Sequence, residues 1–583
     1  MNIQETIKKI LTDALTTLDV AVSSGAIVLE HPTELSHGDF SANIAMSLAK
    51  KEGKNPREFA EQILAEIEKN LPTEIISVAV AGPGFINFKL ADKFFADSLG
   101  EITKQGDDFG KNNNTHETWV IEHTSPNPNK AMHLGHLRNN LTGMAIANVA
   151  EWNGAHVIRD MVDNNRGIAI AKLMWGYLKF AKKDDENTDV DYWFDHQGEW
   201  ETPDDQGIRP DRFVDALYVR GSEDFKIPDV EKIVRDFVVR WEADDQKIRA
   251  LWQTVLDYST QGQQMTLDRL GNKWDYKWHE HEHYQQGKDL VAEGLSKGIF
   301  QKLDDGAILT NLESYNIPDT IVQKSDGTAL YITQDLALTR LKKEKYNADK
   351  LFWVIGPEQS LAMKQMFAVS EQLGTGNFSD FIHIPYGWMS LKGQGKMSSR
   401  EGTVVYIDDM IDEAKAKVME RLENKDDALA EMVALGAVKF FILKVGRNQD
   451  TAFDVDESIS IEGDSGPYLQ YTYARCRSML EKAHNLEIEP LSSIPDKWEI
   501  TDVERLLYRF PEIIEKSLVD YAPHHVAQYL IDIAHAFNSF YGNTKIVDAD
   551  DVTSPYKLAI TSAVSQVIKN GLEILGIESP ERM

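Results

Sequence analysis

A strand–helix–strand pattern constrains the fold more than any other part of the chain. The apolar run "TWVIEHTS" (118–125) is followed by a loop with two prolines, by the helical pattern "HLRNNLTGMAIANVAEWNG" (136–154) and by a second strand-like run, "AHVIRDMV" (155–162). Such a unit forms parallel strands joined by a right-handed crossover. A further apolar strand pattern, "KLFWVIG" (350–356), lies between helical stretches. We therefore predict a doubly wound α/β domain, with ligands at the carboxyl ends of its strands.

Patterns on both sides of this domain indicate two more domains, since 583 residues are too many for a single core. Before it, residues 55–71 have apolar positions at helical spacing, and alternation around a Gly-Pro-Gly turn in 76–90 predicts a β-hairpin. Toward the C-terminus the patterns are helical almost throughout. We expect an N-terminal α/β domain in 1–110, the doubly wound domain in 111–425 and an α-helical domain in 426–583.

Composition restricts the partners and the compartment. Asp and Glu outnumber Lys and Arg by 93 to 62, and the net charge of −31 argues against broad, nonspecific binding of nucleic acid. A local basic face remains compatible with this balance, so a nucleic-acid partner must be inferred from motifs. No apolar run approaches the ~18–20 residues that cross a bilayer, and the N-terminus resembles neither a signal nor a transit peptide. With a single cysteine, Cys476, we expect a cytoplasmic protein without a membrane partner.

Two polar segments carry weaker indications. The acidic stretch 182–207 interrupts the doubly wound pattern, and we expect it to form a surface insertion. The segment "HEHEH" (279–283) has histidines on alternate residues, as a metal-binding strand would. The residues around it supply no closed ligand set, and the glutamates can pair with histidinium. We therefore predict a solvated segment there and no metal site.

The first candidate for chemistry is "HLGH" (133–136), where a helix begins after the proline loop. A helix N-terminus offers free N–H groups and a partial positive charge to an anion. His133 and His136 lie on one side of a turn and can both donate to phosphate oxygens. Gly135 leaves room for a flat ring to approach the backbone. Surface histidines near a helix cap are the alternative, and the α/β context makes the two readings about equal.

A second motif is the glycine-flanked loop "GKMSSREG" (395–402). Lys396 on a mobile loop would meet phosphate charge only when the loop closes. Taken alone, the motif is explained more simply as a solvated basic turn. Together and in this order, the two motifs indicate that a carboxylate attacks the α-phosphate of ATP and that pyrophosphate leaves in line. Positioning and charge stabilisation would carry such a reaction without a covalent intermediate on the protein.

The two motifs resemble the signatures of class I aminoacyl-tRNA synthetases, and the wider match resembles the arginyl-tRNA synthetase family along nearly the whole chain. The segments that carry this resemblance are "GDFSANIAMSLAK", "GPGFINF", "VIEHTSPNPNKAMHLGHLRN", "LYITQDLA", "GKMSSREGTVV", "SIEGDSGPYLQYTYARCRSML", "AHAFNSFY" and "LGIESPERM". The resemblance implies a Rossmann-type catalytic core between an N-terminal tRNA-contacting domain and a C-terminal α-helical anticodon-binding domain.

The resemblance also implies roles for particular residues. The expected catalytic residues are His133, His136 and Lys396. The residues expected to complete the ATP site are Gly135, Met397, Ser398 and Arg400. The residues expected to hold the backbone end or the side chain of arginine are Glu122, Asn127, Tyr331, Asp335 and Gln359. Asp335 would receive the guanidinium group, and its carboxylate should reject neutral citrulline. The chain departs from the family signature at Ser399 and Arg400, where a second lysine is usual, so Arg400 is only a candidate helper.

The implied reaction joins L-arginine to its tRNA. Arginine and ATP, the latter with Mg²⁺, would form arginyl-adenylate, and arginine would pass to the 3′ end of tRNA(Arg). We expect a monomer without a structural metal, and a need for tRNA even in the first step. The alternatives are a noncatalytic synthetase paralogue that binds tRNA and a class I synthetase for another amino acid, although a cysteine enzyme would need zinc-binding cysteines that this chain lacks.

The C-terminal domain contains cations and aromatic residues that could contact RNA. Arg475 and Arg477 lie among tyrosines on one predicted helix, and RNA contact and ordinary packing explain them equally well. For the aromatic residues of "FNSFY" (537–541) we expect packing rather than base stacking.

Overall fold

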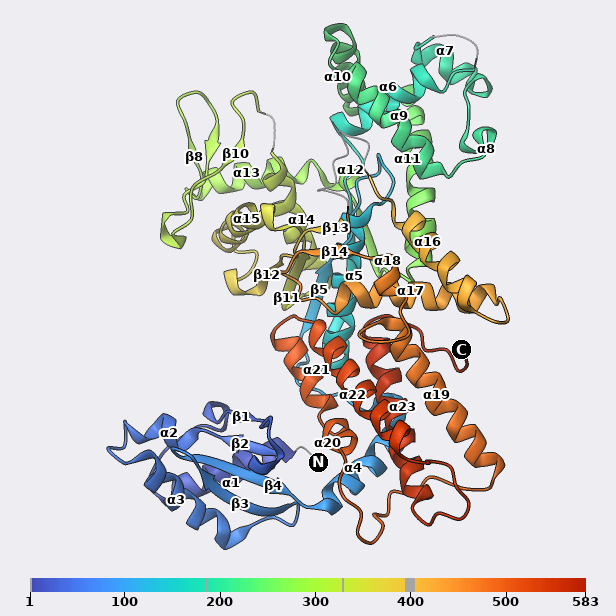
Figure 1. Ribbon diagram of the computed structural model, residues 1–583. Coiled ribbons are helices and arrows are strands. Elements are labelled where there is room, and N and C mark those ends of the chain that lie inside the picture. Colours follow the sequence, from blue (N-terminus) through green and yellow to red (C-terminus); the bar gives the residue numbers. More distant parts are fainter. Residues whose placement is uncertain (1–2, 184–186, 328–329, 394–403) are drawn as a thin grey trace. The chain divides into compact units, whose positions relative to one another are not determined.

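The structure, a computed structural model, describes residues 3–183, 187–327, 330–393 and 404–583 (Figure 1). The described chain divides into two compact units. The first comprises Met1–Phe109, Arg475–Phe510 and Asp532–Ile568, and the second comprises Gly110–Ala474, Pro511–Ile531 and Lys569–Met583. None of the helices in the described ranges combines the length and the apolar character that a bilayer-spanning helix needs.

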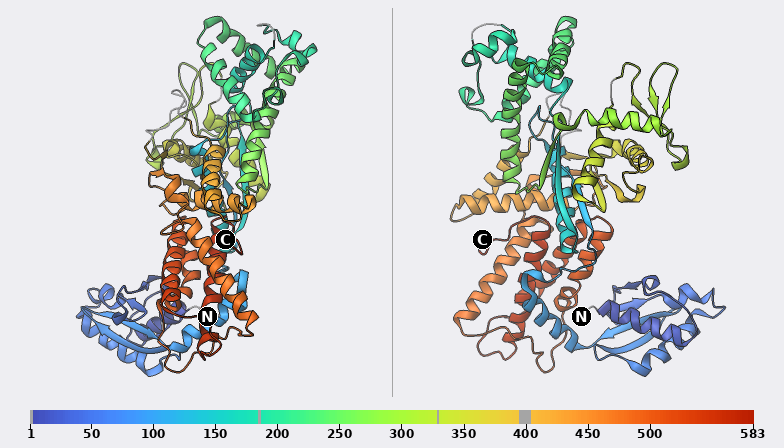
Figure 2. Two further views of the ribbon diagram at one scale, coloured as in Figure 1. Left: turned by 45° about the vertical axis from the view of Figure 1, so that its right-hand side comes forward. Right: turned by 180° about the vertical axis from the view of Figure 1, so that it is seen from behind.

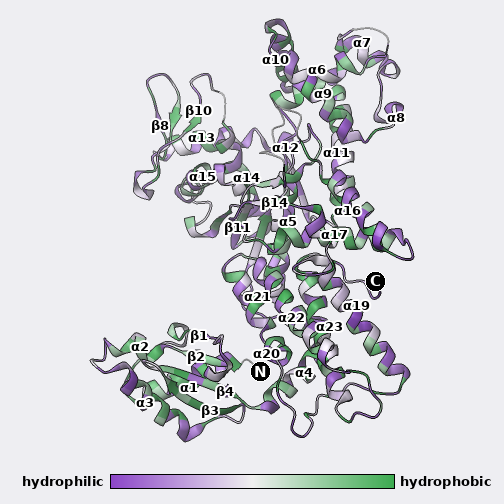
Figure 3. Ribbon diagram, viewed as in Figure 1, coloured by the Kyte–Doolittle hydropathy of each residue, from purple (hydrophilic) through white to green (hydrophobic). Residues whose placement is uncertain are grey.

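The first unit contains an antiparallel sheet with the strand order β1-β2-β4-β3. Its strands are β1 (Leu29–Glu30), β2 (Phe40–Ala42), β3 (Ile75–Ala81) and β4 (Phe85–Leu90). β3 and β4 form the predicted hairpin, and Figure 3 shows them mostly in the colour of hydrophobic residues. The helices of this unit that the N-terminal segment supplies are α1 (Ile3–Thr17), α2 (Ile44–Ala49), α3 (Pro56–Ile67) and α4 (Asp92–Gln105). They bury apolar residues such as Ile7 and Phe59 against Phe88 of the sheet.

The second unit contains the predicted doubly wound sheet. Its parallel strands are β5 (Thr118–Glu122), β6 (His156–Asp163), β7 (Tyr276–His279), β11 (Lys350–Val354) and β12 (Phe381–Ile384). Their order is β12-β11-β5-β6-β7, and α5 (Leu134–Trp152) connects β5 to β6 as the pattern predicted. β5 and β6 lie side by side in every view (Figures 1 and 2). The strand order reverses between β5 and β11, so the crevice at their carboxyl ends is where ligands of such folds bind.

Helices cover both faces of this sheet because its strands are apolar on both sides. Trp119 and Ile121 of β5 pack with Ile146 of α5, whereas Val120 packs with residues of α14 (Tyr331–Tyr346) and α15 (Ser360–Gln372). The continuous apolar runs, rather than alternating ones, are what made the parallel sheet predictable.

The stretch expected to be a surface insertion belongs to a helical subdomain between β6 and β7. Its helices are α6 (Ile168–Phe180), α7 (Val190–Asp195), α8 (Pro203–Gln206), α9 (Pro210–Asp224), α10 (Pro228–Glu242) and α11 (Gln246–Arg269). Trp193 and Trp200 are only 0% and 1% exposed in its core, and Trp200 Nε1 donates to the Leu178 carbonyl at 2.8 Å. Most of the described residues of 182–207 are accessible to solvent, as expected of a surface insertion, and the two tryptophans anchor this acidic segment to the subdomain.

The remaining elements complete both units. Those of the second unit are α12 (Glu280–His283), α13 (Gln286–Ser296), β8 (Gln301–Lys302), β9 (Ile308–Leu309), β10 (Ile321–Gln323), β13 (Met389–Leu391), α16 (Ile407–Arg421), α17 (Asp427–Leu443), β14 (Thr451–Phe453) and α18 (Val455–Ser458). The C-terminal helices are α19 (Gly466–Asn485), α20 (Asp502–Leu507), α21 (Phe510–Val519), α22 (His524–Asn543) and α23 (Ser554–Ile574). The helical character predicted for this end of the chain is confirmed.

Candidate active site

The chain leaves β5 through a strained loop that leads to the histidine motif. Thr124 and Ser125 have positive φ values of 72° and 32°, a region that residues other than glycine seldom adopt. The Thr124 N–H donates to Asn139 Oδ1 at 2.6 Å, and Asn140 Nδ2 donates to Thr124 Oγ1 at 3.0 Å. Asn139 Nδ2 also donates to the Val354 carbonyl at the end of β11 (2.8 Å). These two asparagines, which the motifs did not indicate, fix the loop beside the crevice between β5 and β11.

The two histidines of the motif stack at the N-terminus of α5. His133 is the N-cap residue, and its ring centroid lies 3.9 Å from that of His136. The Gly135 N–H donates to His133 Nδ1 at 3.2 Å, and the His133 N–H donates to His136 Nδ1 at 3.1 Å. Burial lowers the pKa of both rings, that of His133 to about 4. A neutral imidazole that accepts at Nδ1 carries its proton on Nε2, so both Nε2–H groups are donors at a helix N-terminus, an arrangement that suits an anion.

Two neighbours of the histidines shape the site further. A Cβ at Gly135 would stand 3.1 Å from His133 Cε1, so the glycine makes room for that imidazole. Lys130 was missed by the motif analysis, and only its place just before the histidine motif could have indicated it. Burial lowers the pKa of the Lys130 ammonium group, and its charge in turn contributes to lowering the pKa values of His133 and His136. Lys130 thus adds a cation beside the two Nε2–H donors.

The residues of the second motif that were expected to bind ATP, Lys396, Met397, Ser398 and Arg400, lie outside the described residues. The segment directly downstream is described, and it pairs with the histidine motif. Residues 405–407 run antiparallel to 132–134, with a β-bridge between His133 and Tyr406 and backbone hydrogen bonds of 3.0 and 3.2 Å on either side of it. The histidine motif therefore adjoins the described segment that follows the second motif, through a short antiparallel ribbon.

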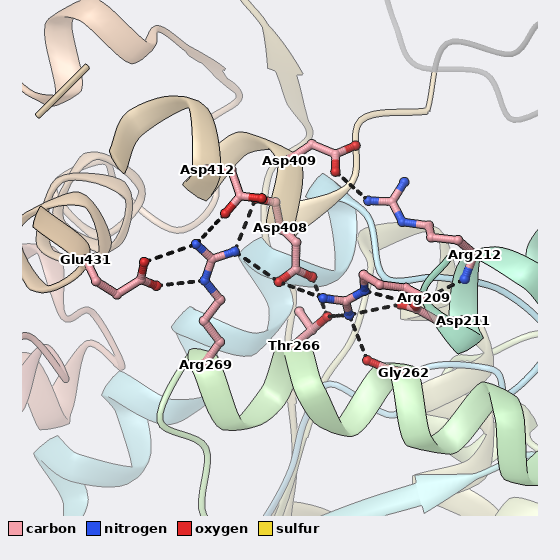
Figure 4. A network of polar contacts seen from close by, with 10 residues as sticks. All are labelled: Arg209, Asp211, Arg212, Gly262, Thr266, Arg269, Asp408, Asp409, Asp412 and Glu431. Carbon is pink, nitrogen blue, oxygen red and sulfur yellow. Dashed lines mark hydrogen bonds and ion pairs between the residues drawn. The ribbon is translucent and has the colours of Figure 1, made fainter. Parts of the chain in front are cut away.

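A network of ion pairs anchors the helix that follows this ribbon (Figure 4). Asp408, in the first turn of α16, is 6% exposed and pairs with Arg209 (3.1 Å) and Arg269 (3.2 Å). Arg269, at the end of α11, also pairs with Asp412 (2.6 Å) and with Glu431 of α17 (2.7 Å). Buried charges are stable only when each has its partners. The start of α16 is consequently tied to helices of the insertion subdomain.

Two of the expected arginine-binding residues lie together. Glu122 ends β5, and Asp335 lies in the second turn of α14. Burial, and then the charge of Glu122, raise the pKa of Asp335 to about 7. The other expected residues, Asn127, Tyr331 and Gln359, lie in the loop after β5, at the start of α14 and just after β11, and their side chains are exposed. The pair of carboxylates is suited to a guanidinium group, which can donate to both.

Comparison with known proteins agrees with this geometry. Residues 98–455 match the family described as class I tRNA synthetases (R), catalytic domain, residues 1–90 match the arginyl-tRNA synthetase N-terminal domain, and residues 469–583 match the DALR anticodon-binding domain. Proteins named arginine–tRNA ligase from Bacteroides thetaiotaomicron and Phocaeicola vulgatus are each 31% identical to the chain, covering 93% and 100% of both sequences. The chain belongs to the arginyl-tRNA synthetase family. An arginyl-tRNA synthetase structure from Thermus thermophilus has the same fold, with a TM-score of 0.80 at 23% identity over 100% of both chains.

Within this arginyl-tRNA synthetase, the segment "HEHEH" differs from its expected solvated state. Glu280 and His283 are only 8% and 5% exposed. His279 Nδ1 lies 3.0 Å from Asp163 Oδ2, and Asn165 Nδ2 donates to His281 Nδ1 at 2.8 Å. Among the described residues, no group of three or more His, Cys, Asp or Glu side chains is arranged to hold a metal ion. The segment is only partly solvated because β7 ends at His279 and the short helix α12 turns Glu280 and His283 into the protein, whereas Glu282 is exposed.

The aromatic residues at the C-terminal end of the synthetase are mostly packing residues. Phe537 is fully buried, as expected. Tyr473 is 3% exposed, and its hydroxyl donates to Glu581 Oε1 at 3.0 Å. The Arg475 guanidinium group lies 4.7 Å from the ring centroid of Tyr541, which is 41% exposed. Packing is therefore confirmed for Phe537 and Tyr473, whereas Arg475 and Tyr541 remain partly accessible to an RNA.

Proposed function

We propose that the protein is an arginine–tRNA ligase. It forms arginyl-adenylate from L-arginine and ATP, releases pyrophosphate, and then transfers arginine to the 3′ end of tRNA(Arg), releasing AMP. The observation that carries this proposal is the position of two neutral histidines at a helix N-terminus, next to a strand that ends in Glu122. The Nδ1 atom of each ring accepts a backbone N–H, so its Nε2–H group is the donor. That arrangement joins an anion site to a carboxylate pocket within one crevice.

In the activation step the arginine carboxylate attacks the α-phosphorus of ATP, and pyrophosphate leaves from the opposite side. The Nε2–H groups of His133 and His136 donate to phosphate oxygens as their negative charge grows, and Lys130 adds a cation there. By family resemblance, Lys396 approaches the pyrophosphate, with Met397, Ser398 and Arg400 beside it. Mg²⁺ enters with ATP as part of the substrate. None of these groups bonds covalently to the substrate, so rate acceleration comes from positioning and charge.

In the amino-acid pocket, Asp335 and Glu122 receive the guanidinium group. Asn127 and Gln359 face the backbone end of the substrate, and Tyr331 closes over the side chain. An ionised Asp335 without a cationic partner is unfavourable in a partly buried site, which is why citrulline, with the same shape and no charge, should bind poorly.

The other parts of the chain serve the RNA. Residues 1–110 contact the tRNA, 111–425 catalyse, and 426–583 bind the anticodon, a division supported by the matching families. A monomer in the cytoplasm accounts for all of these roles, and tRNA docking completes the active site before arginine is activated.

The test is ATP–pyrophosphate exchange with each amino acid, with and without total tRNA. We expect exchange with arginine only, and only in the presence of tRNA. Exchange with another amino acid would refute the pocket assignment. A variant with His133→Ala and His136→Ala should lose exchange and keep tRNA binding; unchanged activity of that variant, or silence of the wild-type protein under all conditions, would favour a noncatalytic tRNA-binding paralogue.

A further inference from the structure

A lysine is buried beneath the arginine pocket. Lys342 lies on α14, two turns after Asp335 and on the same face of the helix, and its side chain is only 1% exposed. Lysine is seldom buried, because its charge loses the solvation of water and must be balanced by the protein. No sequence motif indicated this residue.

The ammonium group of Lys342 bridges two carboxylates of neighbouring strands. Its Nζ donates to Glu122 Oε2 at 2.6 Å and lies 3.2 Å from Asp160 Oδ2. Glu122 and Asp160 are directly paired in the parallel register of β5 and β6, so without a cation the two negative charges would face each other. Trp278 Nε1 donates to the same Asp160 oxygen at 2.9 Å. Lys342 therefore balances a pair of charges that the sheet itself brings together.

The bridge leaves one side of Glu122 available. Among the described residues, Glu122 Oε1 has no hydrogen-bond donor, and the Glu122 side chain is 16% exposed whereas Asp160 is fully buried. The contact with Lys342 through Oε2 alone fixes the rotation of this carboxylate. The open oxygen consequently lies on the accessible side, where Asp335 is close enough for the two charges to interact.

We propose that Lys342 is a positioning residue for arginine recognition, which holds Glu122 by one oxygen so that the other meets the guanidinium group. This inference rests on the proposed function, because it assigns Glu122 to the arginine pocket. Lys342 itself does not touch the substrate. Its charge also offsets part of the negative charge of Glu122, Asp160 and Asp335. One guanidinium group, rather than a proton, then supplies the remaining positive charge.

The ionisable groups around Lys342 come from several elements, and they set the pH dependence. Burial, opposed by Lys342, raises the pKa of Asp160 to about 6 and that of Asp335 to about 7. The other groups facing this cluster are Glu280 and His283 of α12 and Tyr346 of α14. Because Lys342 lowers the pKa of Asp335, its removal should raise that pKa further and shift arginine binding to higher pH.

The test compares Lys342→Met, Lys342→Arg and Arg340→Met by pyrophosphate exchange between pH 6 and 9. Arg340 lies on the same helix and pairs with Glu293 at 2.6 Å, outside the pocket, so its variant controls for loss of a cation from α14. We expect Lys342→Met to raise the KM for arginine at least ~10-fold, with the KM for ATP changed less than about twofold, and to move the pH midpoint of kcat/KM upward by about one unit. Lys342→Arg should retain most of the wild-type behaviour, and Arg340→Met all of it.

A second variant allows for poor folding of Lys342→Met, which leaves Asp160 buried without its cation. The double variant Lys342→Met/Asp160→Asn removes both charges, and it should regain stability yet keep the raised KM and the shifted midpoint. If either variant folds with wild-type KM for arginine and a wild-type pH profile, Lys342 only stabilises the sheet and the proposal is wrong. A wild-type protein that fails to exchange with arginine would refute the proposed function as well, so the two failures are distinguishable.

Discussion

Replacement of Asp335 by asparagine should stabilise the free protein at high pH while abolishing its use of arginine. In the free protein, burial and then Glu122 raise the pKa of Asp335 from an ordinary 3.8 to about 7. The folded protein therefore prefers the neutral carboxyl group. The associated stability is fully present below pH ~4 and is lost as the pH rises through about 7, where Asp335 ionises in the folded state.

The size of the effect follows from the shift. A change from 3.8 to about 7, at about 1.4 kcal/mol per pH unit, sets an upper limit of about 4 kcal/mol. Asp335 is only partly buried, and screening by water reduces this to about 1–3 kcal/mol. Asparagine has the shape of the neutral form and never ionises. The denaturant midpoint of Asp335→Asn should thus match that of wild type only below pH ~4, should exceed it by a growing margin from there to pH ~7, and should exceed it by the full amount at pH 8.5.

The same titration governs substrate binding. About one Asp335 in eleven is ionised at pH 6 and about ten in eleven at pH 8, so kcat/KM for arginine should rise about tenfold over this interval. Arginine should also stabilise the wild-type protein more at pH 8 than at pH 6, and should not stabilise Asp335→Asn at either. The assays are urea unfolding and pyrophosphate exchange on both proteins. Asp160 and Glu280 also titrate near neutrality, but they are present in both proteins, so their contributions to the pH dependence cancel in the difference. Equal stability of the two proteins at pH 8.5, or a kcat/KM for arginine that is flat from pH 6 to 8, would refute the reasoning.

Three further predictions concern other parts of the molecule. His136→Ala should slow adenylate formation by ~10²–10³ with little change in tRNA affinity, because a neutral Nε2–H donor to the transition state is lost. Exchange kinetics and filter binding check this, and an exchange rate of the variant equal to that of wild type would contradict it. Asp408→Asn should lower the free energy of unfolding by about 3–5 kcal/mol, since Arg209 and Arg269 lose a buried partner. Urea unfolding measures this loss, and Asp409→Asn, at an exposed position, is the matched control. Trp200→Ala should lower the free energy of unfolding by about 3–5 kcal/mol, because it leaves a cavity and removes the hydrogen bond to the Leu178 carbonyl. Proteolysis should then cut α7 first, and an unchanged digestion pattern would show that the insertion does not depend on this anchor.

The elements of the catalytic fold were predictable because their signals are local. Each strand of the parallel sheet is an apolar run, and the helix after "HLGH" has a recognisable N-terminus. The residues missed were those whose roles arise only from tertiary contacts. In the sequence, Lys342 cannot be distinguished from the other lysines of a charged helix. Its role arises only because β5 and β6 bring Glu122 and Asp160 next to it. Asn139 likewise gains its role only where α5 crosses the ends of β5 and β11.

The side chains that anchor two polar segments also escaped the sequence analysis, and the cause is physical. The acidic stretch from 182 lies at the surface as its charge predicts, but two buried tryptophans hold it there, and their burial contributes several times more than a few solvated carboxylates cost. For "HEHEH", polarity suggested solvent, yet Glu280 and His283 lie on one side of the short helix α12 and turn into the protein. In both segments a few buried side chains fix the position of the chain, and the average composition does not identify them.

The ribbon that pairs 132–134 with 405–407 has a consequence for how this enzyme can change over evolution. Because backbone hydrogen bonds hold 132–134 in register with 405–407, the chain between these two segments can lengthen or shorten without altering how they pair. The helical subdomain between β6 and β7 occupies that interval, so it is free to diverge in length, charge and partner. A grafted or trimmed insertion should accordingly leave the adenylation chemistry intact, provided that Asp408 keeps its two arginines.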